Sequence, residues 1–249
     1  MVMDANKLAE ITSAERQLDG SQPREAVKPF GWDSHYWTKW AAIVDLIKLT
    51  GVEPPAEVLD VGCGIGWTTR FLDEWGFRVT GLDIAPARVR VAQEISERWS
   101  GEARFECADM DAFDLEGRFD LALIFDALHH SARQRAVVAN VARHLRPGGW
   151  AVFGEPSWLH AISPDARRAT RQHGWVERGV RVSALKSACR EAGLGNFRRF
   201  FEGTQPYEGR VRAFGWQVIR LVAANVWVAP QASVWLAAQR APLNGEARA

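Results

Sequence analysis

A glycine-rich turn just after residue 60 is the feature that most constrains how this chain can fold. A short apolar run from Glu57 leads into three glycines within five positions, Gly62, Gly64 and Gly66. Glycine tolerates positive φ and has no Cβ, so a strand that ends in such a turn brings its backbone close to a bound nucleotide. We therefore predict a strand, then a loop with Gly62 and Gly64 at a cofactor, then a helix.

The neighbours of these glycines indicate which cofactor the loop suits. In a dinucleotide fingerprint the third glycine follows three positions after the second, and here that place is taken by Trp67. Asp60 lies two residues before Gly62, where a carboxylate is unsuited to a diphosphate but suited to a cationic amine. The sequence therefore predicts an adenosyl ligand that bears an amine and no phosphate.

Two further predicted strands also end in an acid. The segment 77–83 ends at Asp83, which we expect to accept both ribose hydroxyls, with Ile84 beside it. The segment 103–108 stops at Asp109, expected at the adenine amine, with Met110 packed on the ring. There are simpler alternatives, in which Asp83 only caps a helix and Asp109 is only a solvated acid. The presence of an acid at each of three strand ends favours a cofactor site over these alternatives.

The motifs together resemble the class I S-adenosylmethionine-dependent methyltransferases, of the bacterial small-molecule type. The resemblance covers about residues 56–155 and rests on V-L-D-V-G-C-G-I-G, G-L-D, A-D-M, F-D-L-A-L-I-F-D-A-L-H-H and L-R-P-G-G, in that order. It implies S-adenosylmethionine as the cofactor and a doubly wound α/β fold, with a mostly parallel seven-stranded sheet whose last strand is reversed. It also implies cofactor contacts from Phe125, Tyr36 and Trp37.

The domain organisation follows from composition and periodicity. We expect a flexible N-terminus over residues 1–27 and a single methyltransferase domain over 28–249. Within that domain we predict a helical cap over 28–52, a cofactor-binding core over 56–155, a sixth strand near 197–201 and a seventh near 232–238. A helical insert over 203–230 is expected to act as a lid. The predicted substrate-binding residues are Trp32, Trp158, His160 and Trp216.

The net charge and the cysteine content limit which binding partners and which cellular compartment are expected. Lys+Arg 31 against Asp+Glu 30 leaves a net charge of +1, which gives no broad attraction to nucleic acid. Three dispersed cysteines suggest neither a disulfide framework nor a zinc pattern, so we expect a cytoplasmic protein. Membrane contact through residues 209–229 is less favoured than packing of this amphipathic stretch on the domain. The oligomeric state is not indicated.

Two adjacent histidines after the predicted fourth strand are the candidate catalytic residues. A hydroxyl acceptor needs a base, and His130 or His129 has a suitable pKa, with His160 and Glu155 as rivals on the same rim. No H-E-x-x-H pattern is present, so no metal is expected, although Asp126, Glu155 and a histidine form a conceivable alternative.

The predicted activity is methyl transfer to a small molecule. The fourth strand lacks the Asn-Pro-Pro-Tyr type of motif found in enzymes that methylate base amino groups. The run from Phe153 to Trp158 is similar to bacterial methyltransferases of surface-glycan or secondary-metabolite pathways. We therefore expect O-methylation of a glycan precursor or secondary metabolite. The alternatives are N-methylation of a small molecule, a non-catalytic adenosyl-binding protein, and a nicotinamide oxidoreductase, against which Trp67 and Asp60 argue.

Overall fold

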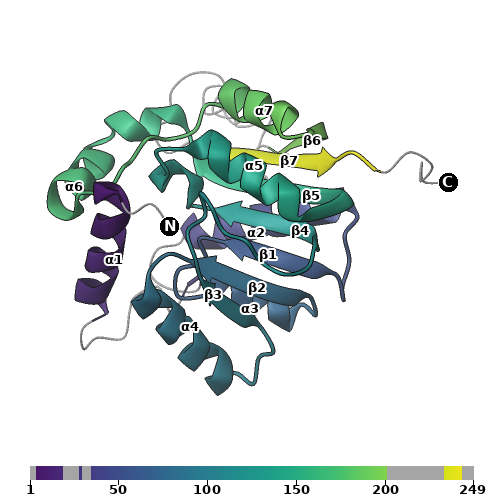
Figure 1. Cartoon of the computed structure of the whole chain (residues 1–249), viewed down its shortest axis with the longest axis horizontal. Helices are drawn as coiled ribbons and strands as arrows, with labels where there is room; N and C mark the ends of the chain where they lie inside the picture. Colours follow the sequence, from purple (N-terminus) through teal and green to yellow (C-terminus); the bar gives the residue numbers. More distant parts are fainter. Residues whose placement is uncertain (1–3, 19–27, 30–34, 201–232, 243–249) are drawn as a thin grey trace, which may run out of the picture.

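A seven-stranded sheet with strand order β3-β2-β1-β4-β5-β7-β6 forms the centre of the molecule (Figure 1). The computed structural model describes residues 4–18, 28–29, 35–200 and 233–242. The strands are β1 (Glu57–Val61), β2 (Arg78–Asp83), β3 (Arg104–Cys107), β4 (Phe119–Phe125), β5 (Leu145–Pro156), β6 (Leu194–Phe200) and β7 (Ser233–Arg240). All neighbours are parallel except β7, which runs antiparallel to both β5 and β6. The predicted fold class, with its reversed last strand, is confirmed.

The strand order reverses direction at β1, which pairs with β2 on one side and β4 on the other. Ligands of open α/β sheets bind in the crevice at such a switch point, outside the carboxyl ends of the strands. In Figure 1 the arrowheads of β1, β2 and β4 point toward the side of the molecule where α1 stands. The topology thus places the glycine turn and both later strand-end acids at one edge.

Helices cover both faces of the sheet. They are α1 (Ala5–Gln17), α2 (His35–Thr50), α3 (Trp67–Glu74), α4 (Pro86–Arg98), α5 (Gln134–His144), α6 (Pro164–His173) and α7 (Val182–Glu191), with short 3₁₀ turns η2 (Leu128–His130) and η3 (Trp158–Ile162). On one face, apolar side chains of α5 and α7 pack with Val61, Ile124 and Phe153. On the other, those of α2 and α3 pack with Trp150 and Trp235. None of the helices in the described part of the chain is long and apolar enough to cross a bilayer.

The N-terminal segment corrects the sequence prediction. Residues 5–17, expected within a flexible tail over 1–27, form α1, and Asp4 caps the helix by accepting a hydrogen bond from the Lys7 backbone N–H at 3.0 Å. The buried residues of α1 are mainly polar, including Lys7 and Glu10. Their partners come from distant parts of the chain, so hydrophobic periodicity carries no sign of this helix.

The predicted cap over 28–52 is present as α2 but sits differently from expectation. Ala42, Ile43, Leu46 and Ile47 are buried, and the helix packs against β5, β6 and β7 instead of lying over the cofactor. Its N-terminal part reaches the strand ends, through Tyr36 at the cavity and through Lys39, whose Nζ lies 3.6 Å from Oδ2 of Asp126. The predicted insert over 203–230 lies outside the described residues.

Candidate active site

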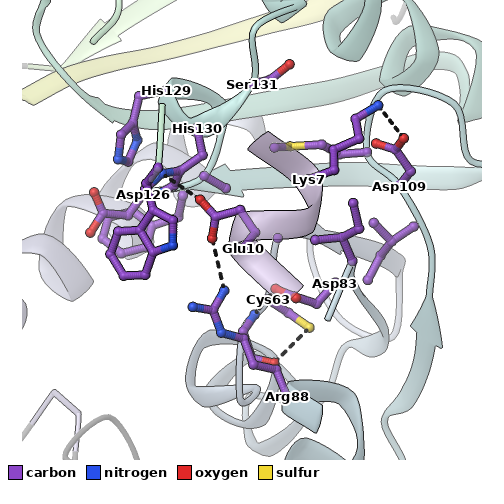
Figure 2. Close-up of a pocket in the computed structure, with 18 of the residues that line it drawn as sticks. Lys7, Glu10, Cys63, Asp83, Arg88, Asp109, Asp126, His129, His130 and Ser131 are labelled. Atoms are coloured by element: carbon purple, nitrogen blue, oxygen red, sulfur yellow. Dashed lines mark hydrogen bonds and ion pairs between the residues drawn. The ribbon is translucent and has the colours of Figure 1, made fainter. Parts of the chain in front are cut away.

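A cavity of about 360 Å³ opens at the carboxyl ends of β1, β2 and β4, beneath α1 (Figure 2). This volume falls in the range of pockets that hold small ligands and cofactors. Of the predicted site residues, those lining it are Tyr36, Gly62, Gly64, Asp83, Ile84, Asp109, Met110, Phe125, His129, His130 and His160. Chain segments far apart in sequence therefore converge here, as the strand-end motifs predicted.

The glycine turn adopts the conformation that its sequence requires. Gly62 and Gly64 have φ of +74° and +58°, and a Cβ on Gly62 would lie 2.4 Å from the Cβ of Ala127. At Gly64 a Cβ would meet no atom within 4 Å, because this residue faces the open cavity. The turn therefore presents bare backbone to a ligand, as an adenosyl cofactor needs.

Asp83 both shapes the glycine turn and faces the cavity. Its Oδ2 accepts the Gly64 N–H at 2.9 Å, and its Oδ1 accepts the Ala85 N–H at 2.9 Å. The carboxylate oxygens keep further lone pairs, since each can accept two hydrogen bonds. Asp83 thus braces the turn ahead of α4 without capping the helix, which has no side-chain cap, and it keeps the capacity to accept a ribose diol.

Asp60 does not line the cavity, which corrects its predicted place beside the cofactor amine. Its Oδ2 instead accepts hydrogen bonds from the hydroxyls of Thr68 and Thr69 at 2.6 and 2.7 Å. Burial raises the pKa of Asp60 to about 6, although the two hydroxyls act in the opposite direction. The side chain points into the start of α3 and supports the glycine turn from behind.

Aromatic rings form one wall of the cavity. Trp67 makes edge-on contacts with Tyr36 and Phe125, with ring centroids 6.1 and 5.7 Å apart, and Phe125 stacks on Trp235. Trp37 and Trp158, predicted at the site, are half exposed and do not line the cavity. Trp158 instead lies beneath the guanidinium of Arg181, 5.2 Å away, because η3 turns the chain outward after β5. Trp32 and Trp216 lie outside the described residues.

His129 is buried between two glutamates at the far end of the cavity. Its Nδ1 lies 2.8 Å from Oε2 of Glu155 and its Nε2 lies 3.5 Å from Oε2 of Glu177. Burial opposes the charged imidazolium, but the hydrogen bond and charge of Glu155 outweigh it, so the pKa of His129 is raised. Glu155 also accepts the backbone N–H groups of Ala127 and Leu128, at 3.1 and 2.9 Å. These bonds make Glu155 a support for the loop after β4 and remove it as a candidate base.

His130 lies next to this pair but in a different electrostatic environment. Its Nδ1 is 3.3 Å from Oε1 of Glu10 and 3.7 Å from Oε1 of Glu177. Neither His130 Nδ1 nor Glu10 Oε1 has a hydrogen-bond partner among the described residues, and both atoms are buried. Burial and the charge of His129 hold the pKa of His130 well below its usual range, while burial raises that of Glu10 to about 7. His130 is therefore neutral at neutral pH.

Helix α1 closes the cavity with residues that the sequence analysis did not single out. In Figure 2 the side chains of Lys7 and Glu10 leave the helix in different directions. Lys7 Nζ lies 2.6 Å from Oδ2 of Asp109 and 2.9 Å from Oδ2 of Asp111, and Glu10 lies 3.8 Å from a guanidinium nitrogen of Arg88. Glu177, which follows α6, was missed as well. No spacing pattern links these residues to the strand ends.

Comparison with known proteins agrees with this geometry. Residues 58–149 match the family described as a methyltransferase domain. A ubiquinone biosynthesis O-methyltransferase of Idiomarina loihiensis is 31% identical over 131 residues, 50% of this chain and 52% of that protein. A demethylmenaquinone methyltransferase of Tropheryma whipplei is 31% identical over 157 residues, 62% of each chain. The chain thus spans between half and two thirds of these curated relatives.

Solved structures share the fold. Phosphoethanolamine N-methyltransferase 2 of Haemonchus contortus, in complex with S-adenosyl-L-methionine, superposes with a TM-score of 0.62 at 16% identity, over 97% of this chain and 60% of that one. The N-methyltransferase NodS of Bradyrhizobium japonicum, in complex with S-adenosyl-L-homocysteine, superposes with a TM-score of 0.58 at 20% identity. The superposition covers 95% of this chain and 99% of that one.

Fold, glycine turn and strand-end acids together define a Rossmann-like protein with a cavity at the switch point of its sheet. The match of residues 58–149 to the methyltransferase domain family identifies the kind of Rossmann-like domain. Residues 58–149 therefore carry a methyltransferase domain of the S-adenosylmethionine-dependent kind.

Proposed function

We propose that this chain transfers a methyl group from S-adenosylmethionine to a hydroxyl oxygen of a small molecule. The cofactor supplies an electrophilic methyl group, and the protein must align the acceptor and remove its proton. The observation that carries the proposal is that His130 lines the same cavity as Gly64 and Asp83, the residues expected to hold the cofactor. Binding, alignment and proton removal are thereby assigned to a single site.

In this proposal His130 takes the hydroxyl proton. The lowered pKa of His130 keeps the imidazole unprotonated at neutral pH, which a proton acceptor requires. Glu177 lies 3.7 Å from its Nδ1, where its carboxylate favours the imidazolium formed once the proton arrives. His129 is less suitable, because both of its ring nitrogens face carboxylates and its side chain is only 4% exposed.

The wall of the cavity favours an acceptor with a flat, apolar part. Tyr36, Trp67 and Phe125 present aromatic surface between the glycine turn and the loop after β4, and Trp175 lies beside His130. Of the two acceptor classes predicted from the sequence, this surface favours an aromatic secondary metabolite over a glycan precursor. The relatives named for ubiquinone and menaquinone synthesis support the same choice.

A screen with a labelled methyl donor tests the proposal. Hydroxylated aromatic compounds, sugar nucleotides and primary amines are offered to the wild type, to His130→Asn and to His173→Asn, a control on α6 that removes a histidine away from the cavity lining. We expect transfer to a hydroxyl, and a loss of about 10²–10⁴ in turnover in His130→Asn alone, with unchanged S-adenosylhomocysteine affinity. Methylation of amines only, or full turnover in His130→Asn, would contradict it.

A further inference from the structure

Three side chains beside His130 bring their ligating atoms to one point. They are His129 from η2, His160 from η3 and Glu177 from the segment after α6, and their ligating atoms lie within 4.8 Å of one another. Oε2 of Glu177 is 2.8 Å from Nε2 of His160 and 3.5 Å from Nε2 of His129. Three different segments of the chain thus converge on the carboxylate of Glu177.

These separations fit a metal ion with tetrahedral coordination. Zinc binds histidine nitrogen and carboxylate oxygen at about 2.0–2.2 Å, so two ligands in a tetrahedron lie about 3.3 Å apart. The measured 2.8 and 3.5 Å fall on either side of that value. Two histidines and one glutamate are also a donor set known from catalytic zinc sites, which keep one position open.

The surroundings of His129 are those of a metal ligand. A ligating histidine almost always donates its second N–H to a carboxylate or a carbonyl, which fixes the ring and its tautomer. His129 has such a partner, since its Nδ1 lies 2.8 Å from Oε2 of the fully buried Glu155. Its Nε2 is thereby directed at Glu177 and away from the loop.

Charge at this end of the cavity points the same way. Glu155 and Glu177 place two carboxylates beside His129, and Glu10 adds a third close to Glu177 and His130. Glu10 Oε1 is buried, has no hydrogen-bond partner among the described residues, and lies 3.3 Å from Nδ1 of His130, the neighbour of His129 in the chain. A divalent cation would balance this negative charge with the histidines in their neutral, ligating form.

The geometry points to a divalent transition-metal site, of the zinc type, formed by His129, His160 and Glu177 with Glu155 supporting His129. The three ligands line the cavity, whereas Glu155 lies behind His129 and does not. The open coordination position therefore faces the space where the acceptor binds. A metal in this place would lower the pKa of a coordinated hydroxyl and orient it. That role for the metal rests on the proposed O-methyl transfer, whereas metal binding itself does not.

Cobalt(II) titration of the full, untagged chain tests the site without any acceptor. The chain is stripped with a chelator, and Co²⁺ binding is followed by visible absorption and by calorimetry in the wild type, Glu177→Gln, His160→Asn and the control His173→Asn. We expect one Co²⁺ per chain with a tetrahedral spectrum in the wild type and in the control. Removing a residue that hydrogen-bonds a metal ligand typically weakens metal binding about tenfold or more, and removing a ligand itself should weaken it at least as much. We therefore expect Glu177→Gln and His160→Asn each to weaken Co²⁺ binding by about tenfold or more.

Two outcomes would overturn the site. One is the absence of saturable Co²⁺ binding in the wild type, and the other is unchanged binding in both Glu177→Gln and His160→Asn. Circular dichroism and S-adenosylhomocysteine binding, measured on the same samples, show that each variant is folded. Because the titration contains no acceptor, failure of the O-methyl transfer proposal in the acceptor screen leaves this result standing.

Discussion

Lys7 and Asp109 are joined by a buried ion pair, with Nζ of the lysine 2.6 Å from Oδ2 of the aspartate although 102 residues separate them. Asp109 follows β3, where the cofactor's adenine amine is expected, and Lys7 lies in the first turn of α1. Asp111 accepts the same ammonium at 2.9 Å. The pair therefore ties the helix that closes the cavity to the strand ends that form its floor.

Breaking this pair should release α1. In Lys7→Met, Asp109 and Asp111 lose their buried cation, and removing one partner of a buried pair typically costs about 3–5 kcal/mol. We expect faster hydrogen exchange over residues 5–17 and faster dissociation of S-adenosylhomocysteine, measured by mass spectrometry and stopped flow. Lys48→Met, at an exposed lysine on α2, is the control. Unchanged exchange over 5–17 in Lys7→Met would show that other contacts hold α1.

Asp83 should dominate cofactor affinity. The ribose hydroxyls would donate to an ionised carboxylate, and loss of such charge-assisted bonds costs about 1.5–3 kcal/mol, or roughly tenfold or more in affinity. Calorimetric titration of Asp83→Ala with S-adenosylhomocysteine measures this loss, with Asp45→Ala, an exposed acid on α2, as the control. Equal affinity in a folded Asp83→Ala protein would remove the ribose assignment.

The residues that the sequence places together, and that the structure brings to one cavity, are those encoded locally. Gly62, Gly64 and Asp83 lie at the ends of short apolar strands, and parallel strands bring their carboxyl ends to one edge. Chain connectivity alone therefore places these residues together, and the pattern of each strand can be recognised without knowledge of the others.

The part that the sequence misses depends on contacts between polar residues. Lys7, Glu10 and Glu177 are polar side chains whose burial rests on partners elsewhere in the chain, and polar residues are normally assigned to the surface. Trp158 shows the opposite error, since a large aromatic residue just after β5 is expected at the site and lies half exposed instead. The direction that the chain takes in η3 decides whether Trp158 reaches the site, and no pattern in the sequence indicates that direction.

Asp60 should make stability fall as the pH rises. Its pKa is raised from 3.8 to about 6 in the folded chain, so the folded state retains a proton that the unfolded state has lost. This contribution is fully present below pH 3.8 and is lost as the pH passes 6, a change of about 3 kcal/mol in the free energy of unfolding. Urea unfolding of Asp60→Asn and wild type across this interval measures it. Parallel pH profiles for the two proteins would contradict a buried Asp60 with a raised pKa.

The pH dependence of turnover separates the two adjacent histidines. The proposed base must be unprotonated, and burial together with the charge of His129 holds the pKa of His130 well below 6.5. With His130 as the base, kcat/KM should stay level through neutral pH and fall only in acid, once the pH drops below that lowered pKa. The pKa of His129 is raised, so an enzyme that relied on His129 would lose activity already at or above pH 6.5. A kcat/KM profile with the acceptor from the screen distinguishes them, and His130→Asn should lack the acid limb. An acid limb that persists unchanged in His130→Asn would contradict His130 as the base.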